Sequence, residues 1–348
     1  MWGKIHPWSK TLALVVAVLI LAGAVASLRG QEEEPEVPDE APELPELPQI
    51  FITGNDVTNP PAIILHVYGR DDEGKAIDFT SEPLTMTSNG TPVIPSVTDG
   101  YPAGTFTIFL IDIPTGVEAQ LPAIQDSIKQ FASAGSGMQE QIDYVAIYQV
   151  GESEASQLMP PDNFYNSVNN FFMDDLTPET GSTALIDSLV SMLEQVEDLK
   201  PDPIMASSIV VMSDGTDVVS TQFEPTDIYT RTLGLNLPIH TIWVDSTDLT
   251  FAGQQQGQAF LQEIADNSYG VATTLDDSEG LAEIWSHIAS FREHARVGYV
   301  LDELAGGSFD IELRLTNDPS ASDSMIVEMP DNQPQVTLDL PEGVDSLS

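Results

Sequence analysis

The sequence predicts an α/β domain with a doubly wound, mainly parallel sheet, inserted into a β-sandwich that is built from the strands on either side of it. Three observations predict this arrangement. Four uninterrupted apolar runs occur in the middle of the chain, segments with helical periodicity accompany them, and strand-rich segments lie before and after. Strands that are buried on both faces are apolar throughout, and their alternation with helices is typical of parallel sheets.

The middle region, residues 104–295, carries the apolar runs FTIFLID, DYVAIYQV, SSIVVMSD and IHTIWVD. Apolar residues at helical spacing define one face of each expected helix. These residues are Leu121, Ile124, Ile128 and Phe131 in the first helix, Leu185, Leu189, Met192, Val196 and Leu199 in the second, and Leu281, Ile284, Ile288 and Phe291 in the last. The region is therefore expected to form the α/β domain.

The two flanking segments, residues 50–100 and 297–341, are rich in short strand-like runs. In the first of them Asn89-Gly90 separates two such runs, which is a strong hairpin signal. Neither flank has enough strands for a stable sandwich of its own, so we expect the two to pair into one. Residues 342–348 would then form a tail.

The N-terminal part predicts export. Residues 11–28 carry no charge and would span about 27 Å as a helix, close to the thickness of a bilayer core. Lys4 and Lys10 precede this stretch, so residues 1–10 are expected to be cytoplasmic and the body of the protein to lie outside the membrane. The alternative is a signal peptide cleaved after the small residues around Ala24 and Ala26, which would give a secreted protein.

Composition narrows the range of functions. The 348 residues include 55 acidic and 11 basic ones, for a formal net charge of −44, so nucleic-acid binding is not expected. Residues 29–49 are rich in acid and proline, which predicts an extended spacer. The chain has no cysteine and therefore no disulfides or thiol chemistry. It also lacks the glycine-rich phosphate loop of ATPases and the nucleophile elbow of serine hydrolases.

Oxygen-bearing residues follow the expected strands at one edge of the sheet. Asp112 ends the first apolar run, Asp214 ends the third, and Thr183 precedes a helix. Ligands of open α/β sheets bind at the carboxyl ends of the strands, so these residues are candidates for a binding site. A structural alternative stays open, in which the two aspartates cap turns and Thr183 is the N-cap of the helix.

This trio, in this order, resembles the von Willebrand factor type A family, particularly exported bacterial members with flanking β-rich segments. The stretches FLQEIADNSYGVATTLDDSEGLAEIWSHIA (residues 260–289) and REHARVGYVLDEL are similar to the end of that domain and its exit. The family's metal-ion-dependent adhesion site reads Asp-x-Ser-x-Ser, then a distant Thr and a distant Asp. The resemblance implies that Asp112, Thr183 and Asp214 are metal ligands.

The two serines of that motif fall on Pro114 and Gly116, which have no side-chain oxygen. Thr115 lies between them but would project differently. A degenerate site is therefore expected, one that binds Mg²⁺ or Ca²⁺ weakly at most.

Together these features predict a protein-binding or adhesion module without enzymatic activity, tethered to the cell membrane or secreted. Its partner, another protein, would meet the carboxyl edge of the sheet at loops 112–118, 178–184 and 214–226. The alternatives are a structural or assembly component of a cell-envelope complex and a metal-dependent hydrolase. The hydrolase would require a deep pocket with several acids.

Overall fold

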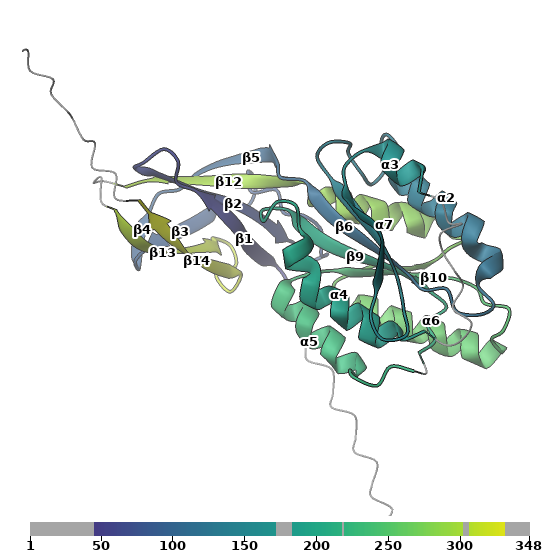
Figure 1. Ribbon diagram of the computed structural model, residues 1–348. Coiled ribbons are helices and arrows are strands. Elements are labelled where there is room, and N and C mark those ends of the chain that lie inside the picture. Colours follow the sequence, from purple (N-terminus) through teal and green to yellow (C-terminus); the bar gives the residue numbers. More distant parts are fainter. Residues whose placement is uncertain (1–44, 172–182, 218, 302–305, 331–348) are drawn as a thin grey trace, which may run out of the picture. The chain divides into compact units, whose positions relative to one another are not determined.

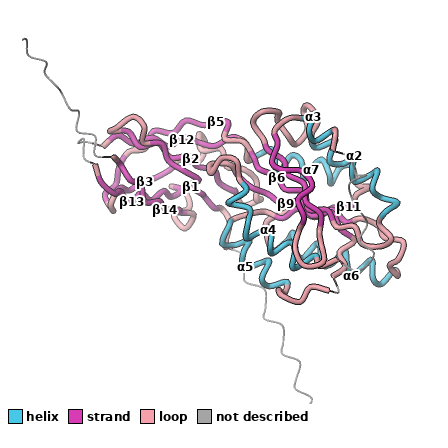
Figure 2. Tube along the Cα trace, viewed as in Figure 1, coloured by secondary structure: helices cyan, strands magenta, loops and turns pink. Residues whose placement is uncertain are grey.

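The computed structural model describes residues 45–171, 183–217, 219–301 and 306–330, all of which fall in one compact unit, Pro42–Ser348. These residues form one mostly parallel sheet covered by helices and two antiparallel sheets (Figures 1 and 2). The predicted fold class is therefore confirmed. Within the described residues no helix is long and apolar enough to cross a bilayer, and the predicted span at residues 11–28 lies outside them.

The central sheet has the order β11-β10-β9-β6-β7-β8. Its strands are β6 (Thr105–Ile111), β7 (Tyr144–Gln149), β8 (Ser156–Asp162), β9 (Ala206–Ser213), β10 (Ile239–Trp243) and β11 (Ala272–Thr274). Four of them correspond to the four apolar runs. The edge strand β8 runs antiparallel to β7 and was not expected, because its Pro160-Pro161 pair opposes strand formation except at a sheet edge.

Helices cover both faces of this sheet. They are the short 3₁₀ helix η1 (Glu118–Gln120), α2 (Leu121–Phe131), α3 (Tyr165–Asn169), α4 (Leu185–Leu199), α5 (Pro225–Leu235), α6 (Phe251–Asp266) and α7 (Ser278–Ser290). Helices α2 and α7 share a core cluster with Phe109 and Ile111 of β6. On the opposite face, the Thr241 hydroxyl of β10 donates a 3.0 Å hydrogen bond to the Leu261 carbonyl of α6.

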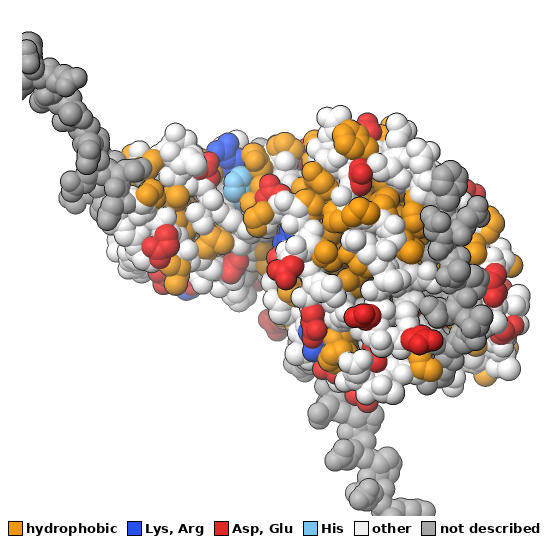
Figure 3. All heavy atoms as spheres, viewed as in Figure 1, with side chains coloured by type: hydrophobic (Ala, Val, Ile, Leu, Met, Phe, Trp, Pro, Cys, Tyr) orange, Lys and Arg blue, Asp and Glu red, His pale blue; other side chains and the backbone are white. Residues whose placement is uncertain are grey.

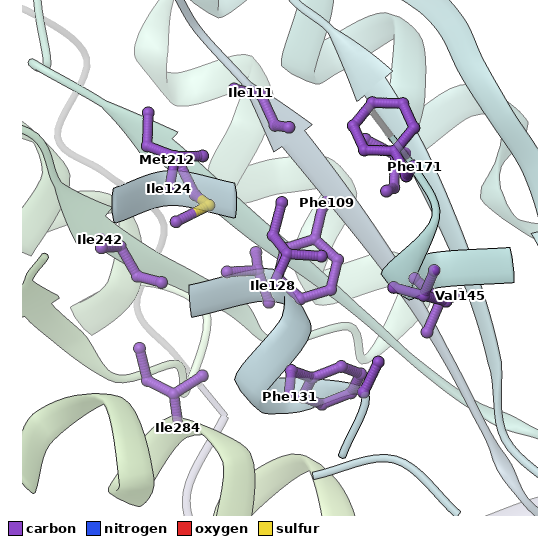
Figure 4. Packing of buried hydrophobic residues seen from close by; sticks show 14 of the residues in the cluster. Phe109, Ile111, Ile124, Ile128, Phe131, Val145, Phe171, Met212, Ile242 and Ile284 are labelled. Atoms are coloured by element: carbon purple, nitrogen blue, oxygen red, sulfur yellow. The ribbon is translucent and has the colours of Figure 1, made fainter. Parts of the chain in front are cut away.

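The core under α2 and α7 is built around Phe109 of β6 (Figure 4). The Phe109 ring meets the Phe131 ring of α2 edge-on at 5.3 Å between centroids and the Trp285 ring of α7 at 6.0 Å. Both phenylalanines are fully buried and Trp285 is 3% exposed. The helical spacing of apolar residues in the sequence thus corresponds to the observed buried faces.

The β-sandwich combines strands from both flanks. One sheet has the order β1-β2-β12-β5 and the other β14-β13-β3-β4. The strands are β1 (Gln49–Asp56), β2 (Ala62–Arg70), β3 (Leu84–Ser88), β4 (Thr91–Val93), β5 (Ser96–Pro102), β12 (Glu293–Val300), β13 (Gly307–Leu315) and β14 (Ser322–Met329).

Pairing across the insertion confirms the predicted sandwich. Strand β12, which follows the α/β domain, lies between β2 and β5, which precede it, and β13 pairs with β3. The two sheets enclose one apolar core. Asn89 and Gly90 both have positive φ, 48° and 73°, and connect β3 to β4 as the hairpin signal predicted. Predictions for residues 1–44 and 331–348 lie outside the described part of the chain.

The surface reflects the composition. Acidic side chains are spread over the visible face between apolar and neutral ones, and basic side chains are few (Figure 3).

Candidate functional site

Asp112, Thr183 and Asp214 lie at the carboxyl edge of the central sheet, as the sequence predicted. Asp112 directly follows β6, and its backbone N–H continues the ladder with a 2.8 Å hydrogen bond to the Met212 carbonyl of β9. Asp214 directly follows β9. All three side chains are buried, with exposures of 0%, 2% and 1% in the order given.

The carboxylate of Asp112 is only half satisfied. Its Oδ2 accepts a 2.5 Å hydrogen bond from the Ser213 hydroxyl. Its Oδ1 makes no well-formed hydrogen bond, and neither does the buried Oγ1 of Thr183, although the Thr183 hydroxyl lies near enough to the carboxylate to lower its pKa. Buried polar atoms without partners are rare and costly, so these two oxygens call for an explanation.

The electrostatics of Asp112 follow from its burial. Desolvation raises the pKa of Asp112 from 3.8 to about 7, the neighbouring hydroxyls of Ser213 and Thr183 oppose the rise, and the charges of Asp214 and Asp217 add to it. A bound cation would act in the opposite direction and favour the charged carboxylate.

The alternative that these residues only cap turns and a helix start holds for Asp214 and fails for Thr183. Oδ1 of Asp214 accepts hydrogen bonds from the backbone N–H and the hydroxyl of Thr216, at 3.0 and 2.7 Å, which is a turn-capping arrangement. Helix α4, by contrast, has Ala184 at its N-cap, and the first-turn N–H groups of Ile186 and Asp187 donate to Asp217 Oδ2 at 2.7 Å and to Ser220 Oγ at 3.1 Å. Thr183 is therefore not needed for that helix terminus.

The two positions without side-chain oxygen sit in a tightly packed loop. Gly116 has φ +98°, and a Cβ there would lie 2.8 Å from the Ser246 Oγ and 2.9 Å from the Asp248 backbone nitrogen. Thr115 is exposed, in line with its expected different projection. The loop after β10 thus fills the space that a serine at position 116 would need.

Ser246 was missed by sequence reasoning. It is 1% exposed, and its hydroxyl makes only a long, 3.5 Å hydrogen bond to the Thr115 carbonyl. The available signal was its place directly after the fourth apolar run, IHTIWVD. Its hydroxyl oxygen lies next to the position where the family motif has a serine side chain.

A third acidic residue, Asp187, shapes the site indirectly and was also missed. Its carboxylate accepts backbone hydrogen bonds of 3.0 to 3.3 Å, and its side chain is 1% exposed. The donors are Thr221, Gln222 and Phe223. Asp187 therefore fastens the loop after β9 to the start of α4, beside Thr183. A carboxylate in the first turn of a helix was the only sequence signal.

The donor set fits a hard cation only in part. The unpartnered Asp112 Oδ1 and Thr183 Oγ1 are ligand types that Mg²⁺ and Ca²⁺ accept. Across the described residues, however, no group of three or more His, Cys, Asp or Glu side chains is placed to hold a metal. A cation here would rely on hydroxyls and water as well as carboxylates.

No protein-family model matches this chain, and neither does any curated protein. Among solved structures it is similar to proximal thread matrix protein 1 from the mussel byssus, solved with a zinc-occupied MIDAS motif, at 15% identity and a TM-score of 0.39. That match covers 60% of this chain and 50% of the other, so this chain spans about half the length of the mussel protein.

Two further similar structures come from other organisms. The manganese-loaded TRAP protein of Plasmodium vivax matches at 11% identity and TM-score 0.41, over 68% of this chain and 98% of the other. The three N-terminal domains of the type V pili tip protein Mfa5 of Porphyromonas gingivalis match at 11% identity and TM-score 0.38, over 83% and 78%. The fold described above rests on the sheet order and helix placement themselves.

Proposed function

We propose that this protein is a von Willebrand factor A-like recognition module, exported from the cytoplasm, which binds another protein at the carboxyl edge of its central sheet. The supporting observation is the pair of buried, unpartnered oxygens, Asp112 Oδ1 and Thr183 Oγ1. They lie where the motif resemblance places the ligands of a divalent cation.

Asp112 and Thr183 would contact the cation directly, and Asp214, whose Oδ1 is already committed to Thr216, would act through its remaining oxygen or through water. When bound, the cation would supply a positive charge with a coordination position open to a carboxylate. Because Pro114 and Gly116 contribute no oxygen, we expect binding to be weak. The partner would therefore present an acidic side chain and gain further affinity from the surrounding loops.

The test is calorimetric titration of the metal-free full chain with Mg²⁺, Ca²⁺ and Mn²⁺. Asp112→Asn keeps the size of the side chain and removes its charge. Asp126→Asn, an exposed acid on α2, is the matched control for general attraction of cations to the acidic surface. A saturable site that is lost in Asp112→Asn and kept in Asp126→Asn supports the proposal. Equal binding by all three proteins would exclude a specific site.

Binding of a partner's carboxylate to the metal can be tested separately. Water-proton relaxation of the Mn²⁺-loaded protein reports the water bound to the metal. Adding acetate, the simplest carboxylate, should lower that relaxation if it displaces a bound water. Unchanged relaxation at saturating acetate would mean that the coordination position is not open, and recognition would then depend on the loops alone.

A further inference from the structure

A small cavity lies at the other end of the central strands from the candidate cation site. It is found where β2 of the sandwich meets the starts of β6, β9 and β10, and its volume is about 10 Å³, which is room for one water-sized species. Apart from the half-buried Ser207, its lining is formed by buried residues.

Four lining residues carry a buried polar atom with no hydrogen-bond partner in the structure. These atoms are Arg70 Nε, Thr105 Oγ1, Ser207 Oγ and His240 Nε2. They come from four different strands, so no local turn or cap accounts for them. Their concentration around one cavity indicates that a bound species, and not another group of the protein, satisfies them.

All four groups can donate a hydrogen bond. Arg70 Nε is a permanent donor, and the two hydroxyls can rotate to donate. The ring of His240 accepts a 3.1 Å hydrogen bond from the Val271 N–H at Nδ1, so the proton of the neutral ring is on Nε2. Burial lowers the pKa of His240 well below its usual value, which keeps the ring neutral. The cavity is therefore lined by donors.

The cavity also adjoins a buried positive charge. Arg70 is 1% exposed, and its Nη2 donates a 2.6 Å hydrogen bond to the Asn236 carbonyl. Its guanidinium lies 5.2 to 5.8 Å from the centroids of three aromatic rings, those of Phe51, Tyr269 and Phe291. No ion pair within the described part of the chain includes Arg70. A buried charge that lacks a counter-ion is strongly unfavourable.

We propose that this cavity is a binding site for one small monovalent anion of the halide type, chloride under ordinary salt conditions. The ion would accept hydrogen bonds from Arg70, Thr105, Ser207 and His240 and balance the charge of Arg70. A water molecule accepts only two hydrogen bonds and leaves that charge uncompensated, and polyatomic anions exceed the volume. The ion would join β2 of the sandwich to β6, β9 and β10 of the α/β domain.

Crystals of the full chain grown in sodium bromide give the direct test, because bromide scatters anomalously. An anomalous peak in the cavity beside Arg70 is expected in the native protein and is expected to be lost in Arg70→Met. Ordinary water density without anomalous signal in the native crystals would overturn the proposal, and this result requires no variant to fold.

Thermal unfolding gives a second, solution test. At constant ionic strength, replacing gluconate by chloride should raise the Tm by about 2–4 °C for each tenfold rise in chloride once the ion concentration exceeds Kd. Ser207→Ala, which removes one hydroxyl at a half-buried position, should reduce this difference. Ser133→Ala, at an exposed loop position, should retain it. A chloride effect of the same size in all three proteins, or none in any, would contradict the site.

Discussion

The Ser213 hydroxyl donates a 2.5 Å hydrogen bond to Oδ2 of Asp112 and so joins the carboxyl ends of β9 and β6. This bond orients the carboxylate, and the other oxygen, Oδ1, is left without a protein partner beside Thr183. Two neighbouring strands thus hold one buried acid in a defined orientation. Whether the site binds a cation depends on this pair and on the packing around position 116.

We predict that restoring the motif serine at position 116 will destabilise the fold. Gly116→Ser places a side chain at φ +98° and within 2.8 Å of the Ser246 hydroxyl. Strained backbone costs about 1 kcal/mol and overpacking a further 1–3 kcal/mol. Gly135→Ser is the matched control, since Gly135 has φ +84° with nothing within 4 Å of the added Cβ. Urea unfolding should show the larger loss for Gly116→Ser, and equal losses would mean that the loop after β10 yields freely.

Removing the Asp187 carboxylate should release the loop after β9. Asp187→Ala leaves three backbone N–H groups without their charged acceptor, which should lower the free energy of unfolding by about 3 kcal/mol. Hydrogen exchange of the amides of Thr221, Gln222 and Phe223 should accelerate. Asp187→Asn, which keeps one acceptor oxygen, should show an intermediate effect. Unchanged exchange in Asp187→Ala would show that the loop is held by other contacts.

Acid should destabilise the protein through His294. Burial lowers the pKa of His294 from 6.5 to about 3, with a contribution from the nearby His66. Because the folded-state pKa is below the unfolded one, the unfolded chain binds the extra proton first, and stability falls as pH drops from about 6.5 towards 3. Between pH 7 and pH 5 the native protein should lose about 2 kcal/mol more than His294→Asn. Above pH 7 the two unfolding curves should change in parallel with pH, and parallel behaviour at pH 5 as well would contradict the assignment.

The connection from the α/β domain into β12 should depend on one buried ion pair. Arg292 lies 2.6 Å from Asp143, whose side chain is 1% exposed and also accepts the Thr105 N–H at 2.9 Å. Arg292→Met leaves the buried carboxylate without its counter-charge and should cost about 3–5 kcal/mol. Arg314→Met, which removes the partner of the partly exposed Glu312, should cost less than about 1 kcal/mol. Urea unfolding measures both losses of free energy, and similar losses in the two variants would mean that the buried ion pair stabilises the protein no more than the partly exposed one.

Much of the fold was predictable because it depends on local pattern. The run FTIFLID is apolar on both faces of the strand except for Thr107 and the final Asp112, and β6 is buried throughout. The strands around Asn89-Gly90 and those after residue 297 were expected to pair because neither group could bury its own apolar side chains. The antiparallel strand β8 was not expected, because proline disfavours strands and only an edge position tolerates it.

The candidate site was predictable only as a set of strand ends. Asp112, Thr183 and Asp214 are found where parallel strands and the start of α4 bring them, close to one sheet edge. Ser246 and Asp187 could not be assigned in advance, since their positions depend on how loops far apart in the chain pack against each other. The donors around Arg70 were likewise scattered among runs that the sequence presents only as apolar strands.

By itself, the sequence determined the α/β domain, the sandwich formed across it and the absence of serine oxygens at positions 114 and 116. These features follow from hydrophobic periodicity, from turn chemistry and from residue identity. Only the tertiary structure decided that Asp112 keeps one buried oxygen unpartnered, that Ser246 fills the space beside Gly116 and that Arg70 faces donors without a counter-ion. The physical reason is that hydrogen-bond satisfaction and charge balance depend on distances between segments remote in the chain, which no local pattern encodes.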